Sequence, residues 1–406
     1  MSMRQTAPAH IDIARFGKPA LPAVLEALNG DGVETRIVGG AVRNVLMGME
    51  AGDIDLATTA LPQEVMALGA AAGLKPVPTG VNHGTVTLIA DGEPFEVTTL
   101  REDVETHGRH ATVAFGTDWT RDAERRDFTM NALYVGRDGT VHDPLEGYAD
   151  LAARRVVFIG DAETRIREDY LRILRFFRFH ARFGAGRPDA DGLKAATKLK
   201  SGINRLSAER VWKELKLILG AAEPGIAMRW MRVSGILDVA LPEQAKWGID
   251  DLDKLLAGER ANRWAPDAML RLMSILPPRP DVAGGLADRL KLSNGERRRL
   301  VDYARAHGAV ANATPRTIDR LLYRHGGETV LDVLKLAVAR DNDASRALAP
   351  FIARAEGWTK PELPVSGRDL IARGIAPGPA IGEALDRLEK KWIDSGFTLT
   401  RDELLD

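Results

Sequence analysis

The stretch that decides the fold is Gly-Gly-Ala-Val-Arg at residues 39–43, followed ten residues later by Asp-Ile-Asp at residues 53–55. Two carboxylates at alternate positions of an extended segment point to the same face of a sheet, so they repel each other unless a cation lies between them. Hard oxygen ligands select Mg²⁺ or Mn²⁺, and such ions typically bind nucleotide phosphates and activate an attacking hydroxyl. Asp53 and Asp55 therefore indicate a metal-dependent nucleotide site, whereas an isolated Asp-x-Asp is more often an acidic loop without metal.

The residues around the two glycines predict a strand, a tight turn and a helix start. Residues 35–38 form a short run with β-branched side chains, and residues 41–47 read as the first turns of a helix. Gly40 would let the backbone approach phosphate oxygens closely, and Arg43 would add a forked cation. Neither a Gly-x-Gly-x-x-Gly nor a Gly-x-x-x-x-Gly-Lys motif is present, which disfavours dinucleotide binding and P-loop hydrolysis.

A third carboxylate lies on a predicted hairpin. Residues 84–89 and 94–100 alternate between apolar and polar, and an Asp-Gly turn joins them. This pattern places Glu96 on the face opposite the core. If Asp53 and Asp55 share that face, Glu96 completes a three-carboxylate site, as a second metal ligand or as the group that takes the proton from the attacking hydroxyl. An ordinary solvent-facing strand glutamate is the alternative.

Five motifs in order along the chain resemble those of bacterial tRNA nucleotidyltransferases and poly(A) polymerases, the class II CCA-adding enzymes. They are Gly-Gly-Ala-Val-Arg at 39–43, Asp-Ile-Asp-Leu-Ala-Thr at 53–58, Glu-Val-Thr-Thr-Leu-Arg at 96–101, Arg-Arg-Asp-Phe-Thr-Met-Asn-Ala at 125–132 and Glu-Asp-Tyr-Leu-Arg-Ile-Leu-Arg at 168–175. The resemblance implies an α+β fold with a polymerase β-like nucleotidyltransferase head, built on a mixed sheet with helices and using two Mg²⁺ ions. An all-α neck, body and tail would follow, holding the acceptor stem and 3′ end of tRNA. The expected segments are a catalytic head at 20–150, a nucleotide-selecting neck at 151–225, and a tRNA-binding body and tail at 226–406.

Asp169 and Arg172 are candidates for base selection. They are three residues apart on a predicted helix, so their side chains would be neighbours and would offer an acceptor beside a donor fork. Cytosine and adenine carry an exocyclic amino group beside a ring-nitrogen acceptor, whereas uracil and guanine present a carbonyl beside a ring N–H. A wrong base would leave buried polar groups unpaired at about 1–3 kcal/mol each. A surface ion pair is the alternative.

Further nucleotide-binding residues follow from the resemblance. Arg175 and Arg178 continue the helix face at three-residue steps, and the resemblance implies that both bind the nucleotide, together with Arg126. A solvated basic face is the alternative. Glu168 is expected to orient arginine side chains rather than contact the base.

Three local features remain open. Asp127 and Asn131, four apart on a helix expected from Phe128, could contact ribose or support Arg126. Asn44 stands where the resembling family usually has Asp, so any fixing of Arg43 by charge would be weakened by about 1–2 kcal/mol. The polar residues 102–111 are expected to form a mobile loop beside the active site, and a loop at this position serves the switch from C to A addition in the resembling family.

Composition agrees with a multidomain, nucleic-acid-binding protein. The 406 residues include no cysteine, which excludes disulfides and thiolate zinc sites, and no apolar stretch reaches transmembrane length, so we expect a cytoplasmic location and no membrane partner. Net charge is −1, yet residues 151–220 contain 16 Lys and Arg against 8 Asp and Glu, which indicates a phosphate-contacting surface. Helical spacing continues at residues 286–307, 316–323, 328–340 and 381–392.

The resemblance, together with the acidic site, implies a template-independent nucleotidyltransferase that adds CCA to the 3′ end of tRNA, using CTP and ATP as substrates and no obligate protein partner. Poly(A) synthesis and partial addition of CC or A are the nearest alternatives, since they share the same chemistry. A catalytically silent RNA-binding protein of the same fold is the alternative from another class, and the intact acidic residues argue against it.

Overall fold

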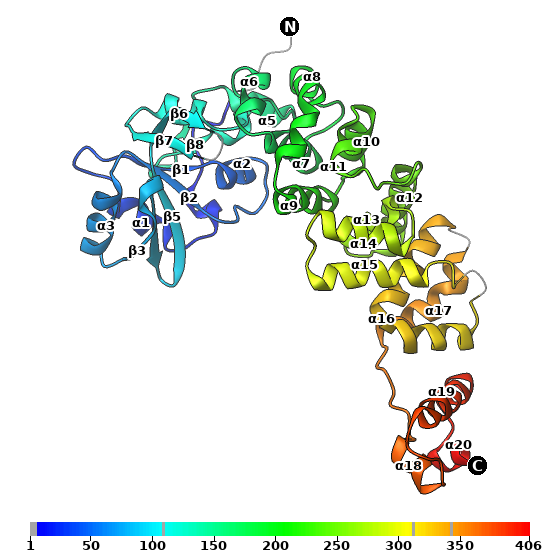
Figure 1. Ribbon diagram of the computed structural model, residues 1–406. Coiled ribbons are helices and arrows are strands. Elements are labelled where there is room, and N and C mark those ends of the chain that lie inside the picture. Colours follow the sequence, from blue (N-terminus) through cyan, green and yellow to red (C-terminus); the bar gives the residue numbers. More distant parts are fainter. Residues whose placement is uncertain (1–5, 108–109, 311–312, 342–343) are drawn as a thin grey trace. The chain divides into compact units, whose positions relative to one another are not determined.

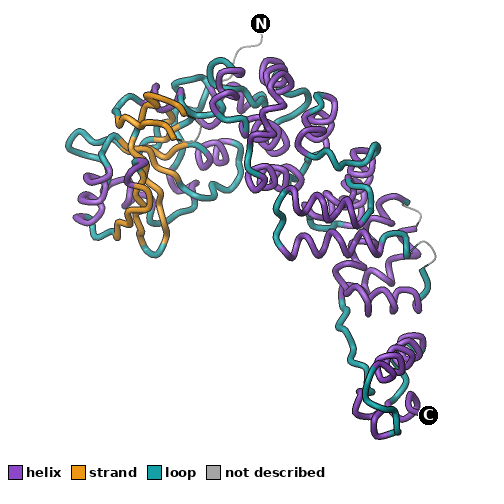
Figure 2. The backbone as a smooth tube through the Cα atoms, viewed as in Figure 1, coloured by secondary structure: helices purple, strands orange, loops and turns teal. Residues whose placement is uncertain are grey.

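The computed structural model describes residues 6–107, 110–310, 313–341 and 344–406, and these form two compact units. The first unit runs to Leu206 and also contains Trp230–Ala240; the second contains Ser207–Arg229 and Leu241–Asp406. These units do not coincide with the functional segments expected from the sequence, because most of the expected neck lies in the same unit as the head. Figure 1 labels the elements, and Figure 2 shows that strands occur in the first part of the chain and helices throughout.

A seven-stranded mixed sheet forms the centre of the first unit, in the order β3-β4-β5-β2-β1-β8-β9. Its strands are β1 (Thr35–Val38), β2 (Asp55–Thr58), β3 (Lys75–Gly80), β4 (Thr85–Ala90), β5 (Glu93–Thr99), β8 (Tyr134–Val135) and β9 (Val141–His142). β2 pairs antiparallel with β1 and parallel with β5, which places the two acidic motifs on neighbouring strands. The predicted β4–β5 hairpin is confirmed, with positive φ at Asp91 and Gly92 as a type I′ turn requires.

The segment expected to be a loop after Leu100 is instead a hairpin. β6 (Arg101–His107) and β7 (His110–Phe115) pair antiparallel as a separate two-stranded sheet, and residues 108–109 of the expected loop lie outside the described residues. The expectation rested on the charged and polar residues, whereas each segment also contains one Val and one Thr, residue types that favour extended backbone.

Short helices surround the sheet. They are η1 (Ile13–Phe16), α1 (Leu21–Ala27), α2 (Gly40–Leu46), α3 (Pro62–Ala71), η2 (Val81–His83), α4 (Trp119–Glu124), η3 (Thr129–Asn131) and α5 (Gly147–Ala152). The helix expected from Phe128 is only the single 3₁₀ turn η3, because Phe128 itself is extended and makes a β-bridge to Phe158. The predicted helix after the glycines is confirmed as α2.

An aromatic cluster joins α7 (Leu171–Phe183) to the head. Phe128 contacts Phe158, Phe176 and Phe179, with ring centroids 4.9–6.4 Å apart. All four rings are buried, and each buries a large apolar surface. Apolar residues on one side of α7 therefore hold its opposite, arginine-bearing side in a defined position within the first unit.

The rest of the chain is helical, as expected. The helices are α6 (Ala162–Glu168), α8 (Ala190–Leu199), η4 (Lys200–Arg205), α9 (Ala208–Leu219), α10 (Gly225–Val233), α11 (Ile236–Ala240), α12 (Gly248–Asn262), α13 (Ala268–Ile275), α14 (Pro280–Arg289), α15 (Asn294–Ala306), α16 (Pro315–Arg340), α17 (Ala344–Glu356), α18 (Gly367–Ala372), α19 (Pro379–Asp394) and α20 (Arg401–Leu405). The helical spacing read through residues 286–307 is interrupted, because Ser293 and Glu296 form a capping box that starts α15. α16 is kinked at Gly326, whose φ is 80°.

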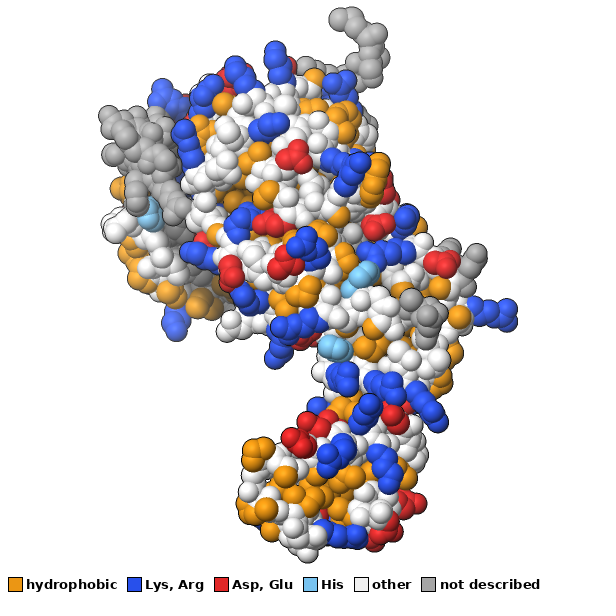
Figure 3. Space-filling view, turned by 45° about the vertical axis from the view of Figure 1, so that its right-hand side comes forward, with side chains coloured by type: hydrophobic (Ala, Val, Ile, Leu, Met, Phe, Trp, Pro, Cys, Tyr) orange, Lys and Arg blue, Asp and Glu red, His pale blue; other side chains and the backbone are white. Residues whose placement is uncertain are grey.

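Charge is mixed over the surface. Figure 3 shows Lys and Arg side chains interspersed with Asp and Glu on the face it presents, and the whole sequence has nearly equal numbers of the two, 56 and 57. Within the described residues, no helix combines the length and apolar character needed to cross a bilayer.

Candidate active site

The three predicted carboxylates lie on one face of the sheet. Asp53 and Asp55 are exposed on either side of Ile54, which is buried, so both aspartates point away from the core at the start of β2. Parallel pairing of β2 with β5 sets Asp55 opposite Glu96. Glu96 is exposed between two buried apolar residues, so it shares the face of the aspartates.

The electrostatics of Asp55 reflect this arrangement. Desolvation by the surrounding protein raises the pKa of the Asp55 carboxyl, and the negative charges of Glu96 and Asp53 raise it further, whereas Arg126 opposes the rise. Among the described side chains, no three acids or histidines converge into a ready-made metal centre. The donor chemistry nevertheless fits a divalent cation: two exposed carboxylates beside a third would lose their mutual repulsion on binding one.

The glycine turn brings two arginines close to the backbone. Gly39 has φ 72° and ψ −119°, a conformation that a side chain would strain, and it precedes α2. A methyl group on Gly39 would lie 3.5 Å from Nη1 of Arg126, and one on Gly40 would lie 3.6 Å from Nη2 of Arg43. The sequence-predicted residues Gly40, Arg43 and Arg126 thus lie around one turn.

Arg43 is held rigidly. Its Nη1 donates to Oδ1 of Asn131 at 2.5 Å, its Nη2 donates to Oδ1 of Asn44 at 2.9 Å, and its guanidinium lies 3.9 Å from the ring centre of Phe183. Burial lowers the pKa of Arg43 to about 9, and the positive charge of Arg182 contributes to this shift. The side chain is 6% exposed and remains protonated at neutral pH.

Asn44 uses both ends of its side-chain amide. While Oδ1 accepts from Arg43, Nδ2 donates to the backbone oxygens of Glu50 at 3.1 Å and Ala51 at 3.3 Å. A carboxylate at this position could not donate to these carbonyls. Asn44 therefore ties the helix that carries Arg43 to the segment that leads into Asp53.

Asp127 and Asn131 support other arginines than the one expected. Asp127 Oδ2 accepts from Nε of Arg175 at 2.9 Å, and its Oδ1 accepts from Nδ2 of Asn131 at 2.8 Å. Asn131 in turn accepts from Arg43. The pair therefore buttresses Arg43 and Arg175 rather than Arg126, because Asp127 is not helical and its carboxylate turns toward α7.

Arg126 depends on a residue that the sequence reasoning missed. Asp122 has a side chain that is 1% exposed, and it accepts from Arg125, from Nη2 of Arg126 at 3.0 Å and from the hydroxyl of Tyr134 at 2.9 Å. The i,i+3 and i,i+4 spacing of Asp122 to the two arginines was a usable signal in the sequence. Arg126 is thus held from beneath by one buried carboxylate.

Asp169 and Arg172 do not share a helix, contrary to the prediction. Asp169 is extended (φ −150°, ψ 108°) at the end of α6, and its Oδ1 accepts from the backbone N–H of Leu171 at 3.0 Å. This side-chain bond competes with helical continuation, so Asp169 ends α6 and helps to start α7. Arg172 lies in the first turn of α7 and donates its backbone N–H to the Asp169 carbonyl at 3.0 Å, which still keeps the two residues adjacent.

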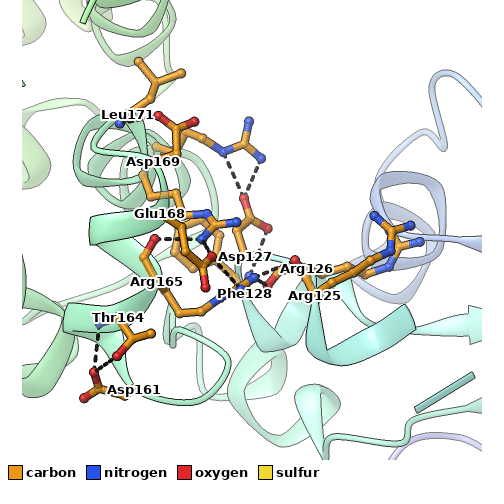
Figure 4. Close-up of polar contacts among 12 residues, drawn as sticks. Arg125, Arg126, Asp127, Phe128, Asp161, Thr164, Arg165, Glu168, Asp169 and Leu171 are labelled. Atoms are coloured by element: carbon orange, nitrogen blue, oxygen red, sulfur yellow. Dashed lines mark hydrogen bonds and ion pairs between the residues drawn. The ribbon is translucent and has the colours of Figure 1, made fainter. Parts of the chain in front are cut away.

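Glu168 contacts arginine side chains, as expected. Figure 4 shows Glu168 close to Arg165, and Oε2 of Glu168 accepts from Nη1 of Arg165 at 2.7 Å and also from Nη1 of Arg172. Arg172 is therefore fixed by Glu168, and Asp169 contributes backbone and capping contacts at the same junction.

An arginine face follows along α7. Arg175 and Arg178 are partly buried, and the Arg178 guanidinium lies 4.6 Å from the ring centre of Phe179. Arg182, which the sequence reasoning did not single out, continues the face one turn further, and its charge acts on buried Arg43. The four-residue spacing from Arg178 to Arg182, which places both on one helix face, was visible in the sequence. Repulsion among these cations would be relieved by a polyanion.

Family models match three segments of the chain. They are the "Poly A polymerase head domain" at residues 35–157, the "Probable RNA and SrmB- binding site of polymerase A" at residues 188–247 and "tRNA nucleotidyltransferase domain 2" at residues 272–406.

Relatives match over nearly the whole length. The chain is 37% identical to the mitochondrial CCA tRNA nucleotidyltransferase 1 of Danio rerio, covering 95% of this chain and 89% of that protein. It is 31% identical to the CCA-adding enzyme of Geobacillus kaustophilus, covering 92% of each. Among solved structures, the Bacillus stearothermophilus CCA-adding enzyme in complex with CTP is 30% identical with a TM-score of 0.68, covering 93% of this chain and 94% of that one. The Thermotoga maritima CCA-adding enzyme complexed with "tRNA_CCA" shares the fold, with a TM-score of 0.70 at 20% identity and 98% coverage of both.

Proposed function

The chain belongs to the CCA tRNA nucleotidyltransferase family, and we propose that it adds C, C and A to the 3′ end of tRNA from CTP and ATP, releasing pyrophosphate. The observation that carries the proposal is the shared face of Asp53, Asp55 and Glu96, with the Arg126 guanidinium within electrostatic reach of Asp55. Carboxylates beside a fixed cation suit attack of a hydroxyl on a phosphate ester.

Asp53 and Asp55 would hold Mg²⁺, and two ions would be present during catalysis. When bound, the ions supply a lowered pKa for the attacking 3′-hydroxyl and neutralise charge on the triphosphate. Glu96 accepts the proton from that hydroxyl as the oxygen attacks the α-phosphorus of the nucleotide, and pyrophosphate leaves on the opposite side. The exposure of all three side chains supports these roles, because each can reach a ligand in solvent.

Gly40, Arg43 and Arg126 would bind the triphosphate, together with Arg175 and Arg178. Arg43 and Arg175 are each oriented by neutral or acidic partners on the head, so their guanidinium groups are pre-positioned before the nucleotide arrives. Fixed donors of this kind stabilise developing charge without reorganising during the reaction.

Asp169 and Arg172 would choose the base. They are adjacent at the α6–α7 junction, although not on one helix, and Arg172 is anchored by Glu168. An acceptor beside a donor fork matches the edges of cytosine and adenine and leaves groups unpaired against uracil and guanine.

We also propose a function for each segment of the chain. Residues 20–150 would carry out the chemistry, residues 151–225 would select the nucleotide, and residues 226–406 would bind the tRNA acceptor stem. The family model for tRNA nucleotidyltransferase domain 2, at residues 272–406, supports the third role, and the RNA-binding model, at residues 188–247, spans the end of the second segment and the start of the third. We propose a cytoplasmic location for this chain; the relative from Danio rerio is named as mitochondrial.

Poly(A) synthesis is the second candidate, favoured by the match of residues 35–157 to a poly(A) polymerase head. One experiment separates the candidates: incubate the purified chain and Mg²⁺ with tRNA lacking all or part of its CCA end, add CTP and ATP separately and together, and sequence the products. Exactly three added residues support CCA addition, long A tails indicate poly(A) synthesis, and termination at CC or a requirement for preformed CC indicates partial activity.

Asp53→Ala tests the acidic site in the same assay. We expect incorporation to fall at least about 1,000-fold, because a metal ligand is lost, while tRNA binding in a filter assay is retained. Asp91→Asn, in the exposed β4–β5 turn, is the matched control and should retain activity. Normal turnover by Asp53→Ala would refute the metal assignment.

A further inference from the structure

Arg165 connects the backbone of Arg125 and Arg126 to Glu168, at the junction that carries the proposed base-selecting residues. It lies in α6 with a side chain that is 11% exposed. Its Nη2 donates to the backbone oxygens of Arg125, at 2.5 Å, and of Arg126. Its Nη1 donates to Oε2 of Glu168 at 2.7 Å. Figure 4 shows Arg165 between the segment that carries Arg125 and Arg126 and the segment that carries Glu168.

The carbonyls that Arg165 binds belong to the end of α4. Arg125 is the C-terminal cap of that helix, where carbonyl oxygens lack intrahelical partners and carry partial negative charge. A guanidinium from another element donates to two of these oxygens, which fixes the backbone at Arg125 and at Arg126, whose side chain lies beside the glycine turn. The backbone position of Arg126 sets where its side chain lies between Asp122 and Asp55.

The other end of the connection is the base-selecting junction. The Glu168 oxygen that accepts from Arg165 also accepts from Arg172, and Nη1 of Arg172 donates to the backbone oxygen of Arg165 at 2.7 Å. Arg165 and Arg172 are therefore locked in a closed set of contacts through one carboxylate. Moving Arg165 would release Arg172 and the end of α4 together.

We propose that Arg165 is a positioning residue for nucleotide selection: it sets the distance between the base-selecting Arg172 and the triphosphate-binding Arg126. The proposal rests on the proposed function. The Arg165 side chain is largely buried, and its guanidinium donates to protein oxygens. Selection of the base then depends on the position of the triphosphate, because a displacement of the Arg126 backbone or of Glu168 moves the same guanidinium.

Lysine cannot reproduce this geometry. An ammonium group has no planar fork, so it can reach the α4 carbonyls or Glu168 but not hold both ends in one orientation. Arg165→Lys therefore keeps charge and volume while uncoupling the two ends. Glu168→Gln weakens the Glu168 link and leaves the α4 cap in place.

The experiment compares Arg165→Lys, Glu168→Gln and Arg167→Gln with the wild type. Arg167 lies on the same helix, with a side chain that is 54% exposed and paired with Glu163, so it is the matched control. Each protein is given tRNA lacking CCA with CTP, ATP, UTP or GTP, and kcat and KM are measured for each nucleotide. Thermal unfolding is recorded in parallel.

We expect Arg165→Lys and Glu168→Gln to lower the ratio of kcat/KM for CTP over UTP at least tenfold. Arg167→Gln should stay within twofold of the wild type. Unchanged selectivity in both test variants overturns the proposal, even if their thermal stability falls, because a purely structural role changes stability and overall rate without changing the choice of base. A wild-type protein that adds no nucleotide would instead reject the proposed function, so the two failures are distinguishable.

Discussion

Replacing Asp122 by asparagine tests the arginine network beneath the site. Asp122 accepts from Nε of Arg125 at 2.8 Å, from Nη2 of Arg126 at 3.0 Å and from the hydroxyl of Tyr134 at 2.9 Å. Asparagine keeps the shape of the side chain but has only one acceptor oxygen. Its amide N–H₂ group would therefore face the donors of one arginine, and both arginines would lose their counter-charge.

The expected loss follows from burial. Removing one partner of a buried ion pair costs about 3–5 kcal/mol. Asp122 is 1% exposed, but the two arginines are 16% and 19% exposed and regain some hydration. We therefore expect the free energy of unfolding at pH 7 to fall by about 3 kcal/mol, at the lower end of that range.

The loss should depend on pH. Burial alone would raise the pKa of Asp122, but the charges of Arg126 and Arg125 hold this pKa below its usual range. A carboxyl whose pKa is lower in the folded state contributes stability that is fully present above its unfolded pKa of about 4, and that is lost as the pH falls through the folded pKa. The difference between wild type and variant should be constant from about pH 8 to pH 5 and shrink below about pH 4.

Urea denaturation at several pH values measures both effects. Asp118→Asn is the control, because Asp118 caps the same helix, is half exposed and lies 3.8 Å from Arg121; it should change the free energy of unfolding by less than about 0.5 kcal/mol. A loss by Asp122→Asn below about 1 kcal/mol at pH 7, or a difference that persists unchanged at acid pH, would refute the reasoning.

Three further substitutions have defined outcomes. Gly39→Ala should destabilise by about 1–3 kcal/mol in urea denaturation, because φ is 72° there; a neutral effect would contradict the backbone argument. Asn44→Asp should keep Arg43 bound but lower the free energy of unfolding by about 1–2 kcal/mol, since two carbonyls lose their donor; unchanged stability would show that these bonds do not matter. Arg271→Met should cost about 3–5 kcal/mol by leaving buried Glu259 unpaired, and adding Glu259→Leu should recover part of the loss; no recovery would contradict the ion-pair explanation.

Much of the site was predictable from short-range patterns. Alternation placed Glu96 opposite the core of its strand, and Ile54 between two aspartates placed both on one face. These inferences need only the two-residue period of a strand and the preference of apolar side chains for burial. The strand, glycine turn and helix at residues 35–46 followed from equally local rules.

Errors arose where a side chain competes with the backbone. Helical spacing through residues 168–175 predicted one continuous helix, but Asp169 bonds the backbone two residues ahead and divides it into α6 and α7. The spacing of Asp127 and Asn131 suggested a helix in the same way, although the two side chains meet in an irregular turn. Periodicity alone does not distinguish these cases from a helix.

The sequence by itself determined which chemical groups this protein has and, through strand alternation, that Asp53 and Asp55 share a face. The tertiary structure decided that Glu96 joins them and which distant partners orient the arginines: Asn131 against Arg43, Asp127 against Arg175, and Arg165 bridging α4 to Glu168. Local rules extend over a few residues, because they depend on backbone period and nearest-neighbour contacts. Bonds between residues 39 to 88 positions apart form only when packing, here of the aromatic cluster on α7, brings those segments together.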